Sequence, residues 1–297
     1  MSKKEIILVG VDGSKESLNA VKWAASRVKK ADARMHIICA YSLPSFTPSS
    51  LEGGYATIDD VSIKEGAQIV VDEAVKLATE EGVEVTSSIE VGDPARILVE
   101  LSNEVSMIVV GKSGTGGGIA DRLLGSVSSA LACHSCCTVV IVPFADEDKD
   151  YSEINEIVVG VDGSESSRLA FKAAIYETKM DNAHLTAVMT VPMTNSLGMF
   201  TWLPFTVEKE VILEDVSNSL NEVIETELAG EELEVTRYAL EGHPTKVLTE
   251  FSSRSDLLVV GTRGRGGFTG LLLGSTSQSL LNYSECPIMI VPSTYEG

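Results

Sequence analysis

Two glycine-rich segments hold residues that could bind an anion, and the second is the more complete. Gly261-Thr262-Arg263-Gly264 is followed by nine residues and then by Gly274-Ser275. Glycine lets backbone N–H groups approach an anion closely and adopts positive φ without strain. A helix that opens at Ser275 would add free N–H groups and a favourable dipole. Together with Arg263 and Arg265, these features predict a phosphate site; a tight turn without a ligand is the alternative.

A near-copy of this segment lies 150 residues earlier, as Gly111-Lys112-Ser113-Gly114 and Gly125-Ser126. Ten residues rather than nine precede its third glycine, and Gly116-Gly117-Gly118 is the expected place for the extra residue. Asp121 adds a negative charge, which Arg122 and Lys112 could offset. We therefore expect the second copy to bind an anion at least as well as the first. We call Gly111–Ser126 and Gly261–Ser275 the first and second glycine motifs.

Two common nucleotide-binding motifs do not fit these segments. Gly111-Lys112-Ser113 could end a Walker A motif, but that motif requires a glycine five residues earlier, where the chain has Ser106. The dinucleotide fingerprint Gly-x-Gly-x-x-Gly does not follow the first predicted strand, which runs into Gly10-Val11-Asp12-Gly13. The glycine motifs therefore indicate a different kind of phosphate site.

The elements that must position these motifs alternate between strands and helices. Apolar runs and helical spacing predict strands at 6–11, 35–40, 83–89, 107–110 and 139–142, and helices at 17–28, 66–78, 94–103 and from 126 to about 132. Ser14 is the expected N-cap of the first helix. Such alternation predicts a parallel sheet with helices on both faces. Asp12 and the first glycine motif would then meet at the carboxyl edge of the sheet, where ligands bind in such folds.

The pattern is present twice. Val9-Gly10-Val11-Asp12-Gly13-Ser14 returns as Val159-Gly160-Val161-Asp162-Gly163-Ser164, at an offset of 150. Gly92-Asp93-Pro94 returns as Gly242-His243-Pro244 at the same offset. Between the copies lies an acidic segment without periodicity. We predict a first domain at 1–143, an acidic linker at 144–154 and a second domain at 155–297.

Composition narrows the classes of partner. The 297 residues carry a formal net charge of −20, which disfavours nucleic acids and anionic membranes. No segment approaches the roughly 20 apolar residues of a membrane span. The five cysteines lack the spacing of a disulfide framework and fit a reducing compartment. We therefore expect a cytoplasmic protein that binds neither nucleic acid nor membrane.

The motifs together resemble the universal stress protein family. The resemblance is carried by the spacing Gly-x2-Gly-x9-Gly-Ser/Thr, by the Val-Gly-Val-Asp-Gly-Ser opening of each copy, and by Cys286-Pro287-Ile288-Met289-Ile290-Val291-Pro292 near the end. It covers essentially the whole chain and implies two tandem, open, parallel five-stranded sheets of order 3-2-1-4-5. Helices would cover both faces, in a Rossmann-like fold of the adenine nucleotide alpha hydrolase type. The fifth strands of the two domains would pair edge to edge.

The resemblance also implies ATP as the ligand, with Mg²⁺ left open. The implied nucleotide contacts are Asp12, Ala40, Gly111, Gly114, Gly125, Ser126, Val127 and Ser128 in the first copy, and Asp162, Thr190, Gly261, Arg263, Gly264, Gly274, Ser275, Thr276 and Ser277 in the second. Ala40 and Thr190 would contact adenine through the backbone. Asp12 and Asp162 could contact the nucleoside or help to hold a metal. No residue is assigned as catalytic or as a metal ligand.

Binding is favoured over turnover, because hydrolysis would need a positioned base and a firm metal site. Asp12 and Asp162 are the obvious acidic candidates, and no His or Glu recurs beside both motifs. We expect an ATP-binding stress regulator with little or no turnover. It would act on a protein partner that the sequence does not identify, and homodimerisation is left open. The alternatives are a slow ATPase or nucleotidyl-transfer enzyme, and a nucleotide-free dimerising scaffold. Cys133-His134-Ser135-Cys136-Cys137 is interpreted as a helix end that enters a strand.

Overall fold

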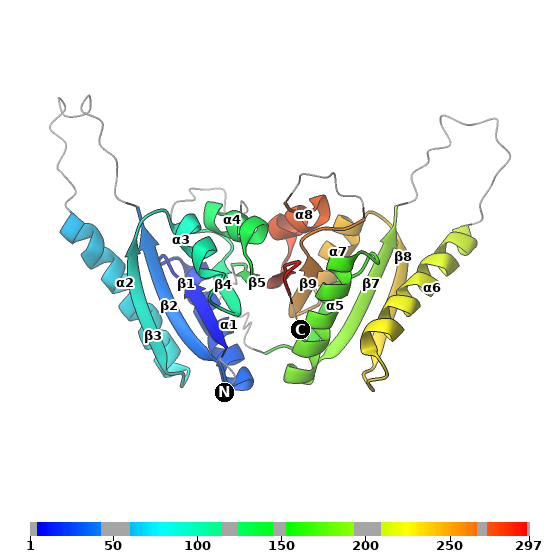
Figure 1. The fold of residues 1–297 in the computed structure, drawn as a ribbon, viewed down its shortest axis with the longest axis horizontal. Helices are drawn as coiled ribbons and strands as arrows, with labels where there is room; N and C mark the ends of the chain where they lie inside the picture. The colour runs from blue at the N-terminus through cyan, green and yellow to red at the C-terminus, as the bar shows by residue number, and fades with distance from the viewer. Residues whose placement is uncertain are drawn as a thin grey trace, which may run out of the picture. The chain divides into compact units, whose positions relative to one another are not determined.

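The computed structural model describes residues 5–42, 60–114, 124–144, 153–192, 209–265 and 272–295. The chain divides into two compact units, Met1–Ser152 and Glu153–Gly297. Each unit is an α/β domain with a parallel sheet and helices on both faces (Figure 1). The predicted fold class is confirmed.

The two units repeat the same order of elements. Unit one contains β1 (Ile6–Gly10), α1 (Lys15–Ala31), β2 (Arg34–Tyr41), α2 (Asp60–Glu80), β3 (Val85–Val91), α3 (Pro94–Leu101), β4 (Met107–Gly111), α4 (Ser126–His134) and β5 (Thr138–Val142). Unit two contains β6 (Glu156–Gly160), α5 (Glu165–Asp181), β7 (His184–Val191), α6 (Lys209–Leu228), β8 (Val235–Glu241), α7 (Pro244–Ser252), β9 (Leu257–Gly261), α8 (Ser275–Tyr283) and β10 (Ile288–Val291).

The sheets have the implied strand order. Unit one runs β3-β2-β1-β4-β5, and unit two runs β8-β7-β6-β9-β10. Every neighbouring pair within each unit is parallel. The first and fourth strands are therefore adjacent, with Gly10 in register with Val110. This register brings the segments after both strands to one edge of the sheet.

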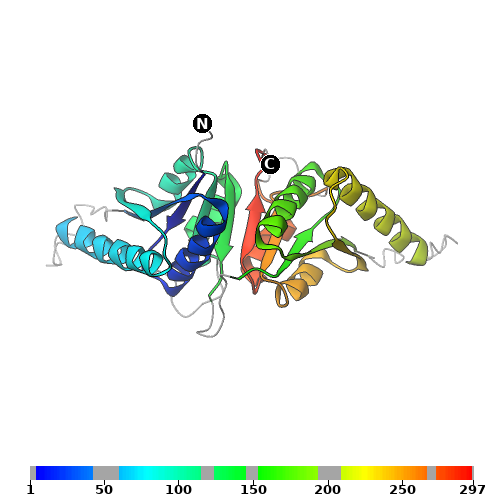
Figure 2. The ribbon, with the colours of Figure 1, turned by 90° about the horizontal axis from the view of Figure 1, so that it is seen from below.

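Helices cover the two faces of each sheet. In unit one, α1 packs against α2 on one face and α3 packs against α4 on the other (Figure 2). Burial follows the apolar spacing of α1, where Val21 and Trp23 are 0% and 1% exposed. The Ser14 side chain accepts a hydrogen bond from Ser17 N, so the predicted N-cap is confirmed. Ser164 caps α5 in the same way.

The predicted start of α2 is wrong by six residues. α2 begins at Asp60 rather than 66, and its first turns are solvent-facing, with Val61 61% exposed. Such turns need no apolar periodicity and leave no signal in the sequence. Ile154, placed in the acidic linker, is 6% exposed and packs as a core residue. Among the described residues, every helix is too short or too polar to span a bilayer.

Candidate functional site

The turn after the first strand is tied to the glycine motif by an aspartate. In unit two, Asp162 Oδ1 accepts hydrogen bonds from Ser164 N at 2.9 Å and Ser164 Oγ at 2.6 Å. Its other oxygen, Oδ2, accepts from Arg265 N at 2.8 Å. A Cβ added to Gly264 would overlap Oδ2. The carboxylate therefore joins β6 to the second glycine motif.

These hydrogen bonds determine the charge state of Asp162. Burial alone would raise its pKa, but the bonds from Ser164, from Arg265 N and from Ser167 hold the pKa below its ordinary value of 3.8. A carboxylate stabilised in this way is a weak base. Asp162 is thus better suited to holding the loop than to activating water.

Unit one repeats this arrangement with Asp12. Its Oδ1 accepts from Ser14 N at 3.0 Å and from Ser14 Oγ at 2.6 Å. A Cβ on Gly114 would overlap Asp12 Oδ2. The two aspartates and the glycines opposite them, which the resemblance assigns to nucleotide binding, are therefore brought together in both units.

The first glycine of each motif is required by packing between a strand and a helix. A Cβ on Gly261 would lie 2.5 Å from the Ser166 carbonyl oxygen, and one on Gly111 would lie 2.7 Å from Glu16 Cβ. Positive φ occurs instead at Gly13 and Gly163, in the turns after the first strands. Among the described glycines of the two motifs, none has a positive φ. Packing against α1 and α5 explains Gly111 and Gly261 without a ligand.

Ser128 and Ser277, two of the implied nucleotide contacts, direct their hydroxyls into the protein. Ser128 Oγ donates to the carbonyl oxygens of Gly111 and Lys112, at 2.8 and 3.1 Å. Ser277 Oγ donates to the carbonyl oxygen of Gly261 at 2.7 Å, and the residue is 6% exposed. These serines hold the fourth helix of each unit against the end of the fourth strand.

The helix starts offer backbone N–H groups to solvent. α4 and α8 have Gly125 and Gly274 as N-caps, and neither cap makes a side-chain hydrogen bond. The N–H groups of the first turn thus have no capping side chain. Ser126 and Ser275 are exposed at these starts. An anion such as a phosphate fits here, because helix N–H groups and dipole both favour it.

The remaining implied contacts lie near these starts or at the second strand. Val127 and Thr276 are half-buried in the first turns of α4 and α8. Ala40 and Thr190 are half-buried near the carboxyl ends of β2 and β7. The register of β1 with β2 places Ala40 on the same sheet edge as Asp12. Their contact with an adenine ring stays a prediction.

The two sites differ in charge. In unit two, Arg263 and Arg265 are exposed, and a Cβ on Gly163 would overlap the Arg265 guanidinium. In unit one, Ser113 Oγ instead donates to Glu16 Oε1 at 2.7 Å, which places a carboxylate beside the first glycine motif. The repeat places Ser166 opposite Glu16. Glu16 was not among the predicted site residues, although a position-by-position comparison of the two copies sets it against Ser166.

The loop residues that distinguish the two copies fall between Gly114 and Gly125. Gly116-Gly117-Gly118, Asp121 and Arg122 lie outside the described residues, so the predicted site of the extra residue stays a prediction. Among the described residues, Arg263 and Arg265 lie at the second motif, and Lys112 and Glu16 lie at the first.

The cysteine segment is a helix end followed by a strand, as predicted. α4 ends at His134 and β5 begins at Thr138. Burial raises the pKa of Cys137 to about 11, and burial together with Asp12 raises that of Cys39 to about 11. Both thiols are therefore protonated near neutral pH. Within the described ranges, no group of three or more His, Cys, Asp or Glu residues is arranged to hold a metal ion.

The fold and these sites define a tandem α/β protein with two candidate anion sites at the carboxyl edges of its sheets. The universal stress protein family matches residues 4–143 and 153–292. The chain belongs to this family and contains two such domains.

Relatives of similar length support this assignment. A universal stress protein of Mycobacterium tuberculosis strain H37Rv is 31% identical over 304 residues, which cover 97% of each chain. A universal stress protein of Mycolicibacterium smegmatis is 31% identical and covers 96% of each. In structure, a universal stress protein of Archaeoglobus fulgidus matches 97% of this chain and 98% of its own, with a TM-score of 0.69 and 21% identity. The last comparison supports the fold alone.

Proposed function

We propose that this chain is an ATP-binding universal stress protein that acts as a nucleotide-dependent regulator of a stress response, with little or no turnover. Unit two is the main nucleotide site in this proposal. The observation that supports it most is the start of α8, where Gly274 forms an N-cap without a side-chain hydrogen bond. A Cβ on Gly274 would lie 3.5 Å from Arg263 Cα, so the free helix start lies directly beside an arginine.

Phosphates at this position would accept hydrogen bonds from the N–H groups at the start of α8, and the positive charges of Arg263 and Arg265 would attract them. Mg²⁺ would accompany the phosphates, and the proposal assigns no protein ligand to it. ATP occupancy would be reported to a protein partner.

A role in catalysis has less support. Both oxygens of Asp162 accept hydrogen bonds from the protein, and its pKa is lowered. The scaffold alternative has one specific observation in its favour, because packing alone explains Gly261.

The first experiment identifies what the protein carries and what it does to ATP. Ligands released from the purified, denatured protein are identified by mass spectrometry, and phosphate release from added ATP is followed over time. The proposal predicts intact ATP and no repeated turnover. Multiple turnovers that are abolished by Asp162→Ala would establish the enzyme alternative instead. If the protein carries no ligand and has no affinity for ATP, the scaffold alternative remains.

A further inference from the structure

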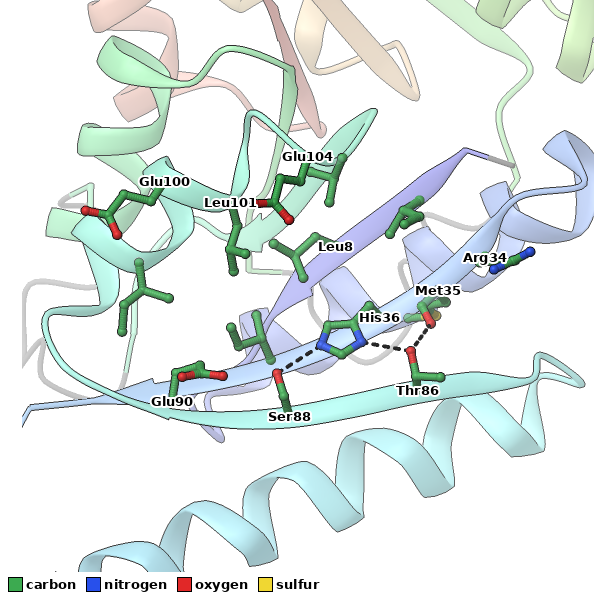
Figure 3. A pocket seen from close by; sticks show the side chains of 14 residues that line it. Leu8, Arg34, Met35, His36, Thr86, Ser88, Glu90, Glu100, Leu101 and Glu104 are labelled. Atoms are coloured by element: carbon green, nitrogen blue, oxygen red, sulfur yellow. Dashed lines mark hydrogen bonds between the residues drawn. The ribbon is translucent and has the colours of Figure 1, made fainter. Parts of the chain in front are cut away.

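A cavity lies on the face of the unit-one sheet that carries α3 (Figure 3). Its volume is about 700 Å³, and β1, β2, β3, α3 and the turn after α3 line it. None of its lining residues belongs to the glycine motif or to the implied ATP contacts. The cavity therefore needs an account of its own.

A histidine network forms one wall of the cavity. His36 Nδ1 lies 2.8 Å from Thr86 Oγ1, and His36 Nε2 lies 2.9 Å from Ser88 Oγ. Thr86 Oγ1 in turn donates to the Met35 carbonyl oxygen at 3.4 Å. Since the Thr86 proton is used there, the threonine oxygen accepts from Nδ1–H, and Nε2 accepts the Ser88 proton.

This network leaves acceptors facing the cavity. Both hydroxyl protons are used within the network, so Ser88 Oγ can offer only lone pairs to a ligand. Burial lowers the pKa of His36, and Glu90 opposes this only in part, so the ring is neutral near pH 7. A ligand that donates hydrogen bonds fits this wall.

The charges around the cavity favour a cation. Glu90, Glu100 and Glu104 are among its lining residues, against one guanidinium, that of Arg34 (Figure 3). Glu100 pairs with Arg96 at 2.8 Å, whereas Glu90 and Glu104 have no ion-pair partner among the described residues. In Figure 3 the Glu104 carboxylate lies on the α3 side of the cavity, across from Ser88 and Glu90 on β3. The lining thus combines unpaired carboxylates with hydrocarbon surface.

The same face of unit two carries larger side chains. Tyr238 stands at the position of Ser88 and Phe251 at that of Leu101, with ring centroids 5.4 Å apart. Arg254 replaces Glu104 and lies 6.0 Å from the Phe251 ring centroid. Two lining positions thus carry larger side chains in unit two, and a guanidinium replaces one carboxylate, so this combination of lining residues is particular to unit one.

We propose that this cavity binds a small organic cation, a protonated amine on an apolar body. The ammonium group donates to Ser88 Oγ and to the Glu90 carboxylate on β3, and the Glu104 carboxylate adds negative charge from the α3 side of the cavity. The apolar body lies against Leu101. This site is independent of the ATP site, and its ligand need not be a nucleotide.

The test uses the whole chain and three matched probes: 4-phenylbutylamine, the neutral 4-phenyl-1-butanol and the anionic 4-phenylbutanoate. Binding is followed by the backbone amide NMR shifts of Ser88 and Leu101, with those of Tyr238 and Phe251 as internal controls. The proposal predicts that the amine binds more tightly than both other probes, shifts only the unit-one amides and does so with or without ATP.

Two double variants locate the site. Glu90→Gln with Glu104→Gln removes the charges and should weaken amine binding by about fivefold or more. Ser88→Tyr with Leu101→Phe copies unit two and should abolish binding. Glu250→Gln, in unit two, should change nothing. Equal affinity for amine and alcohol, unchanged binding in the Glu90/Glu104 variant, or shifts confined to Tyr238 and Phe251 would each overturn the proposal. The Glu90/Glu104 variant keeps the test valid should the filled variant fail to fold.

Discussion

At the scale of single residues, one aspartate in each unit connects the turn after the first strand to the glycine motif. Asp162 could have contacted a nucleoside or a metal. Its two oxygens instead accept hydrogen bonds from Ser164 and from Arg265 N, which fixes the second glycine motif against β6. An aspartate in this position holds the backbone of the glycine motif in place.

Replacing Asp162 by Asn tests this role. The amide NH₂ of the asparagine would face either the Arg265 N–H or the donors of Ser164, and in both orientations a donor would meet a donor. The loss of the charge-assisted hydrogen bonds should lower the free energy of unfolding by about 1.5–3 kcal/mol. Because the folded pKa lies below its ordinary value, this stabilisation is fully present above that value of 3.8 and disappears as pH falls through the folded pKa.

The measurement is the unfolding free energy of wild type and Asp162→Asn in urea at several pH values. The difference should be constant near neutral pH and should shrink below about pH 4. A difference that stays unchanged down to pH 2 would show that the charge of Asp162 contributes nothing.

At the scale of elements, the glycines of one motif serve different purposes. Gly261 lies where β9 passes the start of α5, and the Ser166 carbonyl leaves no room for a side chain. Gly274 begins α8, and the nearest atom to an added Cβ, the Thr262 carbonyl oxygen, lies at 3.4 Å. Packing therefore requires Gly261, while Gly274 leaves space that a ligand could use.

Two alanine substitutions separate these purposes. Gly261→Ala should lower the free energy of unfolding by about 1–3 kcal/mol through overpacking. Gly274→Ala should change it by no more than about 1 kcal/mol, and should weaken ATP binding by crowding the helix start. Thermal unfolding and ATP titration of both variants check this. Equal destabilisation by both substitutions would contradict the assignment.

The sequence predicted the elements well where their signals are local. Alternating apolar runs located the strands, and Ser14 marked the start of α1. The purpose of Gly261 was not predictable, since a glycine that avoids a neighbouring carbonyl and one that admits an anion look alike in a sequence. The charge of Glu16 was also missed, because its contact with Ser113 joins residues 97 positions apart.

At the scale of the whole molecule, duplication has produced two domains of one fold with unlike sites. Unit two has Arg263 and Arg265 at its glycine motif, whereas unit one has Lys112 and Glu16 there. The cavity of unit one is lined by residues whose equivalents in unit two include larger side chains and a guanidinium. The predicted edge-to-edge pairing of β5 with β10 stays a prediction, as do the domain boundaries. The copies are therefore expected to bind different ligands, or the same ligand with different affinity.

The most direct test of the central claim is calorimetric titration of ATP into the whole chain. We predict one tighter site per chain, lost in the Arg263→Gln/Arg265→Gln variant with thermal stability unchanged. Lys112→Gln, in unit one, should retain it, and so should Lys246→Gln, an exposed lysine on α7. Wild-type affinity weaker than about 1 mM, or a tight site that only Lys112→Gln removes, would contradict the account.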